Sequence, residues 1–233
     1  MSGGKGAVLI TRPVLQAGVF AAELKDLGLE LETLVAPLLE VEAVGYEAPD
    51  LDGVDGLVFT SVNGVRFFDH ADVSRDIPVF AVNVQTRETL DRVGYRDIVG
   101  TYGGAVDLEA VLDGRRFLHV RGADVAHEFA DHVEGLVAYR ARVVEAFDDS
   151  VVEAFRAGVV GCVTLFSART ARQFAVLVER YDLTDSLSSI KVLLISDDLV
   201  EYVHTYSWAD LFVAETPNRQ GMIETLKRIY GDE

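Results

Sequence analysis

Two segments of the chain, residues 56–68 and 162–174, follow one pattern: an apolar strand, a serine and then a helix. Aligned on Ser61 and Ser167, both place an arginine five positions and a phenylalanine seven positions after the serine. Continuous β-branched and aromatic runs are typical of buried parallel strands, and serine favours helix N-caps. Each segment therefore directs backbone N–H groups from the carboxyl end of a strand, where open α/β sheets bind ligands. The pattern predicts two similar α/β domains facing a shared cleft, and a ligand with acidic groups at both ends.

Length and composition are consistent with this division. The 233 residues suit one large or two small α/β domains. Hydrophobic residues make up 49% of the sequence, which is ample for a core, yet no apolar run approaches the roughly 20 residues that span a membrane. The start of the sequence lacks a signal-peptide core, and Cys162, inside a predicted strand, is the one cysteine. We expect a cytoplasmic protein in which Cys162 is buried.

The chain is strongly acidic. Lysine plus arginine number 21 against 38 aspartate plus glutamate, which gives a net charge of −17. Such a surface opposes binding to nucleic acid and to anionic membranes. It also repels acidic small molecules at long range, so an anion site here has to depend on local arginines and backbone dipoles.

The periodicity of the chain predicts an inserted domain. Residues 30–44 and 136–147 each alternate apolar with polar side chains, and the two segments could pair as a two-stranded linker. The predicted ranges are then 1–36 and 148–233 for a first, discontinuous domain, 37–46 and 136–147 for the linker, and 47–135 for a second domain.

Each domain is predicted to consist of strand-helix units. In the second domain, strands are expected at 57–60, 79–82, 97–99 and 117–120, and helices at 62–70, 86–93, 106–112 and 124–134. In the first domain, further strands are expected at 7–10, 160–166, 191–195 and 211–213, with a helix at 150–157 and helices after the last three strands.

Motifs for common cofactors and hydrolytic chemistry are missing from the sequence. It contains no Gly-x-Gly-x-x-Gly, Walker A loop, Gly-x-Ser-x-Gly elbow or His-Glu-x-x-His. His119, His127 and His132 lie near one another in sequence, but the last two are five residues apart and would diverge on a helix. We therefore expect no metal site.

Several polar residues can be interpreted in two ways, as structural residues or as residues that bind a ligand. Ser61, Ser167 and Thr86 each follow a predicted strand, where a helix cap needs no ligand. Arg12 and Arg121 come just past predicted strands, at the edge where a ligand would bind, although an arginine there can also be an ordinary surface residue.

The order of short motifs is the most specific feature of the chain. The pieces are Ile10-Thr11-Arg12-Pro13, residues 36–41, residues 59–65, Phe80-Ala81-Val82 leading to Thr86 and Leu90, residues 119–122, residues 137–140 and residues 165–171. This order and spacing resemble those of the uroporphyrinogen-III synthase family over essentially the whole chain.

The resemblance implies two α/β domains joined by a two-stranded linker, with the chain ends in one domain. It implies a hydro-lyase of tetrapyrrole synthesis that closes hydroxymethylbilane into uroporphyrinogen III in the cleft between the domains. In that reaction water is lost and ring D is inverted through a spirocyclic intermediate. It further implies a monomer that needs no metal or organic cofactor.

Family positions carried over one by one give the candidate site. The catalytic candidate is Tyr139, whose plain structural role would be to cover a domain edge. The substrate-binding candidates are Arg12, Ser61, Asn63, Gly64, Thr86, Arg121, Gly122, Ser167, Ala168, Arg169 and Thr170.

The sequence departs from the family pattern at two places. Asn83 stands where relatives commonly have glycine, and Leu199 stands where some members have a threonine. Asp197 and Asp198 beside Leu199 would repel carboxylates, so we do not expect this loop to bind substrate. Two alternatives stay open: a two-lobed protein that binds a small anion without chemistry, and a regulatory domain that retains only the fold.

Overall fold

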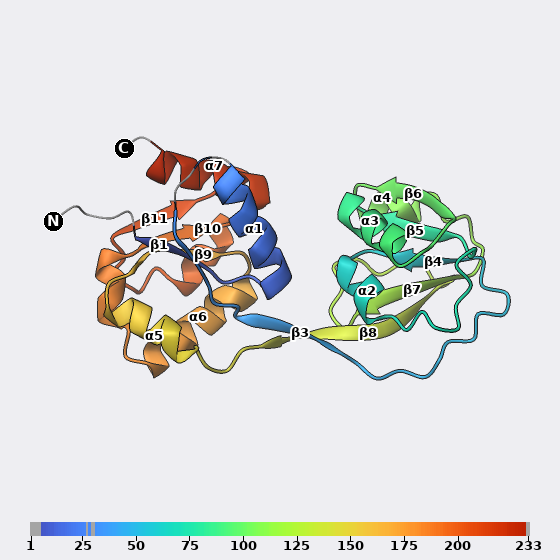
Figure 1. The fold of residues 1–233 in the computed structure, drawn as a ribbon, viewed down its shortest axis with the longest axis horizontal. Helices are drawn as coiled ribbons and strands as arrows, with labels where there is room; N and C mark the ends of the chain where they lie inside the picture. The colour runs from blue at the N-terminus through green and yellow to red at the C-terminus, as the bar shows by residue number, and fades with distance from the viewer. Residues whose placement is uncertain (1–5, 27, 29–30, 232–233) are drawn as a thin grey trace. The chain divides into compact units, whose positions relative to one another are not determined.

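The computed structural model describes residues 6–26, 28 and 31–231, which form two parallel-rich sheets with helices on their faces (Figure 1). The chain divides into two compact units. Unit 1 comprises Met1–Glu40 and Arg142–Glu233, and unit 2 comprises Val41–Ala141. This architecture confirms the α/β class, while the predicted domain and linker ranges stay predictions.

Unit 1 contains a five-stranded sheet in the order β11-β10-β9-β1-β2, with every strand pair parallel. The strands are β1 (Ala7–Ile10), β2 (Thr33–Val35), β9 (Val160–Leu165), β10 (Lys191–Leu194) and β11 (Asp210–Val213). Its helices are α1 (Val14–Asp26), α5 (Asp149–Arg156), α6 (Ala168–Arg180) and α7 (Arg219–Tyr230), with 3₁₀ segments η1 (Thr184–Ser189) and η2 (Asp197–Tyr202).

The sheet of unit 1 is covered on both faces because nearly all side chains of its central strands are apolar and buried. Phe20 of α1 and Met222 of α7 pack with Ile10 on one face. Phe155 of α5 and Phe174 of α6 pack with Val163 on the other. The predicted buried position of Cys162 is confirmed, since this residue is fully buried in the first of these clusters.

Unit 2 contains a six-stranded sheet in the order β3-β8-β7-β4-β5-β6. The strands are β3 (Leu39–Ala43), β4 (Gly56–Phe59), β5 (Val79–Val82), β6 (Ile98–Tyr102), β7 (Phe117–Gly122) and β8 (Val133–Val143). Helices α2 (Val62–Phe67) and α3 (Val84–Arg92) cover one face, and α4 (Ala105–Glu109) lies on the other.

Strands β3 and β8 both cross the boundary between the units. Val44 N donates to Ala138 O at 2.9 Å, and Val144 N donates to Leu38 O at 3.0 Å. The partner numbers run in opposite directions, so the two segments are antiparallel. The predicted two-stranded linker falls on this ribbon, although residue 30 of the predicted extended segment lies outside the described residues.

The prediction of a helix over 124–134 is wrong. Val125, Phe129 and Val133 have helical spacing, but Val133 begins β8 and pairs with Phe117. The intervening chain is tied down by Glu109, which accepts a hydrogen bond from Ala130 N and contacts His127 Nε2 at 2.7 Å. These tertiary contacts override the local pattern.

Three smaller expectations also differ from the structure. Helix α2 ends at Phe67 instead of residue 70, because Phe68 adopts an extended conformation. Helix α4 ends at Glu109 instead of residue 112. A 3₁₀ segment, η2, replaces the α-helix expected after β10.

Asn83 holds an unusual backbone conformation, with φ 64° and ψ 161°, while its side chain accepts a hydrogen bond from Thr86 N at 3.0 Å as the N-cap of α3. We predict that Asn83→Ala lowers the free energy of unfolding by about 1–3 kcal/mol, because it loses the cap and keeps the strain. Asn83→Gly relieves the strain and should melt no lower than wild type.

Asn218, the N-cap of α7, is the matched control because its φ of −145° carries no such strain. There, the glycine variant should melt slightly lower than wild type. Denaturant melts of Asn83→Ala, Asn83→Gly and Asn218→Gly test this, and equal effects of glycine at both positions would contradict it.

Candidate functional site

The order of the strands locates one ligand-binding edge in each unit. In unit 1 the chain passes from β1 to β2 on one side and places β9 on the other. In unit 2 it passes from β4 to β5 on one side and places β7 on the other. Open α/β sheets bind ligands outside the carboxyl ends of strands at such reversals of strand order. The carboxyl ends of β1 and β9, and those of β4 and β7, are therefore the candidate edges.

Ser61 and Tyr139 meet at the edge of unit 2. Ser61 follows β4 as the N-cap of α2, and its Oγ accepts a hydrogen bond from Gly64 N at 3.3 Å. The same Oγ lies 2.7 Å from Tyr139 Oη on β8. The structure thus confirms Ser61 as a helix cap and joins it to a second hydroxyl group at the candidate edge.

Close packing fixes the Tyr139 ring. The ring stacks on Phe67 with centroids 5.9 Å apart. A Cβ added to Gly122 would lie 2.8 Å from Tyr139 Cε2, so only glycine fits beside the ring. The β7–β8 register shifts at this point, and Ala123 N donates to Tyr139 O at 2.8 Å. Gly122 therefore acts through shape: it makes room for the phenol.

A second hydrogen-bonded pair joins Thr60, the residue before Ser61, to His119 on β7. Thr60 Oγ1 is 2.9 Å from Nε2 of His119, which is 4% exposed. Burial, with smaller contributions from the charges of Arg121 and His127, lowers the pKa of His119 to about 4. The imidazole is neutral at pH 7, and its ring packs edge-on to Phe129 with centroids 4.9 Å apart. His119 thus anchors the residue that precedes the Ser61 cap.

Arg121 lies at the end of β7, and its Nη1 donates to Glu128 Oε1 at 2.9 Å. Its side chain is 21% exposed whereas that of Glu128 is 73% exposed. Gly135 permits this placement, because a Cβ there would lie 2.7 Å from Arg121 Nε. The Nε is buried without a hydrogen-bond partner in the described structure. A half-buried guanidinium with an unused donor and one exposed partner is suited to binding a carboxylate.

Arg12 occupies the corresponding edge of unit 1. Thr11 Oγ1 donates to Thr164 O at 2.7 Å, and Thr164 Oγ1 donates to Leu9 O at 3.0 Å, so the ends of β1 and β9 are locked together. The Arg12 guanidinium then lies over the Phe166 ring, 4.6 Å from its centroid. Desolvation by burial is the main cause that lowers the pKa of Arg12.

Ser167 begins the helix on the other side of this edge. It forms a capping box with Thr170: Thr170 N donates to Ser167 Oγ at 3.2 Å, and Ser167 N donates to Thr170 Oγ1 at 3.1 Å. The prediction that Ser167 is a cap is therefore confirmed. The following Ala168 is half-buried and Arg169 is exposed, both in the first turn of α6.

Two positions singled out in the sequence, Thr86 and Leu199, lie apart from these groups, whereas Asn63 lies beside the Ser61 cap. Thr86 is fully buried and its Oγ1 donates to Asn83 Oδ1 at 3.1 Å, so its hydroxyl is already used inside the protein. Leu199 is 1% exposed in the core of unit 1. Asn63 lies half-buried in the first turn of α2, where Gly64 packs so closely that an added Cβ would be 2.7 Å from Val120 O.

The charge distribution at the helix N-termini favours anions. Helix N-termini stabilise carboxylates, yet the first turns of α1, α2, α3, α6 and α7 contain no acidic residue. Among the described helices, acidic first turns occur in α4, α5, η1 and η2. In a chain with 38 acidic residues, the N-termini at both candidate edges are thus left without an internal carboxylate.

Sequence reasoning missed Phe166, Arg219 and the pairing of Thr60 with His119. Phe166 carries the Arg12 guanidinium, and Arg219 is the first residue of α7. The strand-serine-helix pattern already contained Phe166 and Thr60, one position before each serine. Their contacts are with residues far along the chain, so the pattern could not reveal them.

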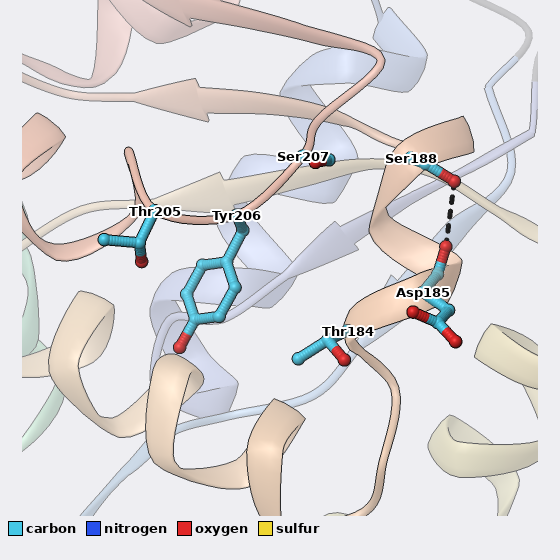
Figure 2. Close-up of a pocket in the computed structure, with 6 residues that line it drawn as sticks. All are labelled: Thr184, Asp185, Ser188, Thr205, Tyr206 and Ser207. Carbon is cyan, nitrogen blue, oxygen red and sulfur yellow. Dashed lines mark hydrogen bonds between the residues drawn. The ribbon is translucent and has the colours of Figure 1, made fainter.

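One pocket lies on the opposite edge of the unit 1 sheet (Figure 2). It has a volume of about 480 Å³ and is lined by Thr184, Asp185, Ser188, Thr205, Tyr206 and Ser207. These residues precede β10 and β11, so they lie at the amino ends of the strands. The Asp185 carboxylate and the lack of a cation in the lining make this pocket unsuited to a polyanion.

The described residues offer neither a metal-binding cluster nor a membrane-spanning helix. In the part of the chain that the structure describes, no group of three or more His, Cys, Asp or Glu side chains is arranged to hold a metal ion. No described helix is long and apolar enough to cross a membrane.

Comparison with known proteins identifies the family. A sequence model described as HEM4, uroporphyrinogen-III synthase HemD, matches residues 18–224. The chain belongs to the uroporphyrinogen-III synthase family. A curated uroporphyrinogen-III synthase of Chlorobaculum parvum is 30% identical over 205 residues, which cover 77% of this chain and 82% of that protein.

A solved structure shares the fold of this family member. The crystal structure of uroporphyrinogen-III synthetase from Helicobacter pylori aligns with a TM-score of 0.63 at 15% sequence identity, over 96% of this chain and 99% of that one. The matching sequence model and the curated relative confirm the predicted family. With it, the chain is assigned as a hydro-lyase of tetrapyrrole biosynthesis.

His119 makes a testable contribution to acid stability. Its pKa is about 4 in the folded protein and about 6.5 when unfolded, so the unfolded state binds more protons between these values. Stability is therefore lost as the pH falls from about 6.5 to 4, by up to about 3 kcal/mol. His119→Gln should flatten the pH dependence of unfolding over this window.

Exposed His204 provides the control, since His204→Gln should melt in parallel with wild type. His70, whose pKa is lowered mainly by burial, is unchanged in both variants. A His119→Gln curve parallel to wild type would refute the prediction.

Proposed function

We propose that this chain closes hydroxymethylbilane into uroporphyrinogen III, with inversion of ring D and loss of water, and that Tyr139 is the general acid. Membership of the family supports the reaction. The observation that carries the assignment of the acid is the 2.7 Å contact between Tyr139 Oη and Ser61 Oγ at the carboxyl edge of the unit 2 sheet.

The hydrogen bonding of Ser61 supports an acidic role for Tyr139. Ser61 Oγ already accepts from Gly64 N, and its own proton is free to be donated to Tyr139 Oη. In that arrangement the phenol proton is directed away from Ser61, toward the hydroxyl of the bilane. As this hydroxyl leaves as water, Ser61 donates to the forming phenolate beside the positive end of α2.

Backbone and cationic groups at the two edges are proposed to hold the carboxylates of the substrate. Hydroxymethylbilane carries eight carboxylates, and in both first turns the capping side chain satisfies one N–H group and leaves others for an anion. The proposed direct contacts are Arg12, Asn63, Gly64, Arg121, Ala168 and Arg169. Ser61, Gly122, Ser167, Thr170 and Thr86 are proposed to support these contacts by capping or by shape.

Positioning is proposed to supply much of the rate. The bilane is reactive without help, so holding its ends in the geometry for closure lowers the entropic part of the barrier. Positioning and acid catalysis require only groups that the chain itself contains. We therefore propose that the reaction proceeds without a metal or organic cofactor. We also propose that the protein acts as a cytoplasmic monomer, as the family resemblance implies.

Isomer analysis of the product tests the proposed function. Incubation of the protein with hydroxymethylbilane should yield uroporphyrinogen III, whereas the uncatalysed reaction gives the type I isomer. Type I product alone, in the presence of folded protein, would favour the alternative of an anion-binding or regulatory protein.

Tyr139→Phe keeps the stacked ring and removes the hydroxyl, so we expect kcat to fall by about tenfold or more with an unchanged melting temperature. Ser61→Ala should lower kcat by a smaller factor, and the double variant should be no slower than Tyr139→Phe, because Ser61 acts through Tyr139. The readout is the initial rate of type III product formation.

Tyr181 supplies a matched control, since its hydroxyl donates to Phe147 O within unit 1. Tyr181→Phe should retain the wild-type rate. A wild-type rate in Tyr139→Phe would remove Tyr139 from the chemistry, and multiplicative effects in the double variant would show that Ser61 acts independently.

A further inference from the structure

The surroundings of the Arg12 guanidinium favour the binding of an anion. Its guanidinium is half-buried over Phe166, and the Phe166 ring is held edge-on by Phe20 with centroids 5.2 Å apart. No carboxylate among the described residues forms an ion pair or hydrogen bond with Arg12. A guanidinium stacked on an aromatic ring keeps all of its in-plane donors available to an acceptor.

Arg219 lies close to Arg12 in a position that is also unfavourable. It is the first residue of α7, a helix of 12 residues, where the positive end of the helix dipole opposes a cation. The charge of Arg219 contributes, after burial, to lowering the pKa of Arg12, so the two cations repel each other. Asn218 already caps α7 by accepting from Gly221 N at 2.9 Å, and the helix does not need Arg219 to begin.

The protein compensates these charges only in part. Glu23 Oε2 lies 3.0 Å from Arg219 Nε, and its charge also acts on Arg12. That oxygen is buried, yet no hydrogen bond of good geometry satisfies it among the described residues. One carboxylate thus faces two guanidinium groups, and this part of unit 1 keeps a positive charge in a chain of net charge −17.

We infer that Arg12 and Arg219 together form a carboxylate-binding site of unit 1, in which Arg219 is a residue that fixes substrate affinity. Phe166 orients the Arg12 fork, and Arg219 supplies the second cation from α7. The inference rests on the proposed function for the identity of the ligand, an acidic side chain of the linear tetrapyrrole. A bound anion would offset both the repulsion between the two arginines and the unfavourable interaction of Arg219 with the positive end of the α7 dipole.

The kinetic test compares two arginines of the same helix. Arg219→Gln removes the charge and should raise KM about tenfold with kcat within about twofold of wild type, since the contact is kept in the transition state. Arg228→Gln makes the same change of charge at the other end of α7, where Arg228 pairs with Glu215 at 2.5 Å, and should leave KM within about twofold. An unchanged KM in Arg219→Gln would overturn the inference.

A double variant separates a shared site from two separate ones. Arg12→Gln should also raise KM, and the double variant should raise it by less than the product of the single effects, because both groups bind one anion. Thermal melts exclude a purely structural role: Arg219→Gln should melt no lower than Arg228→Gln. The shared site would be overturned if the rise in KM of the double variant equalled the product of the two single effects. It would also be overturned if Arg219→Gln had both a lower melting temperature and a lower kcat.

A binding measurement distinguishes failure of this site from failure of the proposed function. Mellitate, a rigid benzene hexacarboxylate, is titrated into each variant while the melting temperature is followed. It should stabilise wild type and Arg228→Gln and lose most of its effect in Arg219→Gln, whether or not the enzyme forms type III product. Equal stabilisation of all three proteins, or none of wild type, would overturn the inference.

Discussion

Parallel pairing of β1 with β9 is the interaction on which unit 1 depends. The strands are separated by about 150 residues, and Ile10 lies opposite Thr164. Gly6 permits the approach, because a Cβ there would lie 2.6 Å from Gly161 Cα. The reciprocal side-chain hydrogen bonds of Thr11 and Thr164 then close the carboxyl ends of both strands. Because the register is fixed at this edge, Arg12 and Phe166 necessarily meet beyond it.

The pairing of β4 with β7 has the same consequence in unit 2. Val120 lies opposite Phe59, and the first turn of α2 approaches β7 so closely that Gly64 is the residue that fits. The register shift at the end of β7 then brings Gly122 opposite Tyr139. Small residues thus set the distances between backbones, and the polar groups of the candidate site follow from them.

Much of this could be predicted from local sequence. The buried strands are continuous apolar runs, and Ser61 and Ser167 cap their helices as the strand-serine-helix pattern predicts. The segment after Gly122 could not be predicted, because its helical spacing of apolar residues competes with a carboxylate of α4 that is remote in sequence. The contacts of His119 with Thr60 and of Arg12 with Phe166 could not be predicted either, because each joins segments that only the sheet brings together.

The two serine caps share the same local structure, but their hydroxyl groups have different hydrogen-bond partners. Ser167 gains a second hydroxyl partner three residues later, and Thr170 fills the hydrogen bonds of the cap from within its own helix. At the corresponding position α2 has Gly64, which offers only a backbone N–H. Ser61 therefore keeps a free proton and lone pair, and the glycine that lets α2 approach β7 also leaves the Ser61 hydroxyl available to Tyr139. The absence of a side chain at Gly64 thus permits both the close packing of α2 on β7 and the contact of the Ser61 hydroxyl with Tyr139.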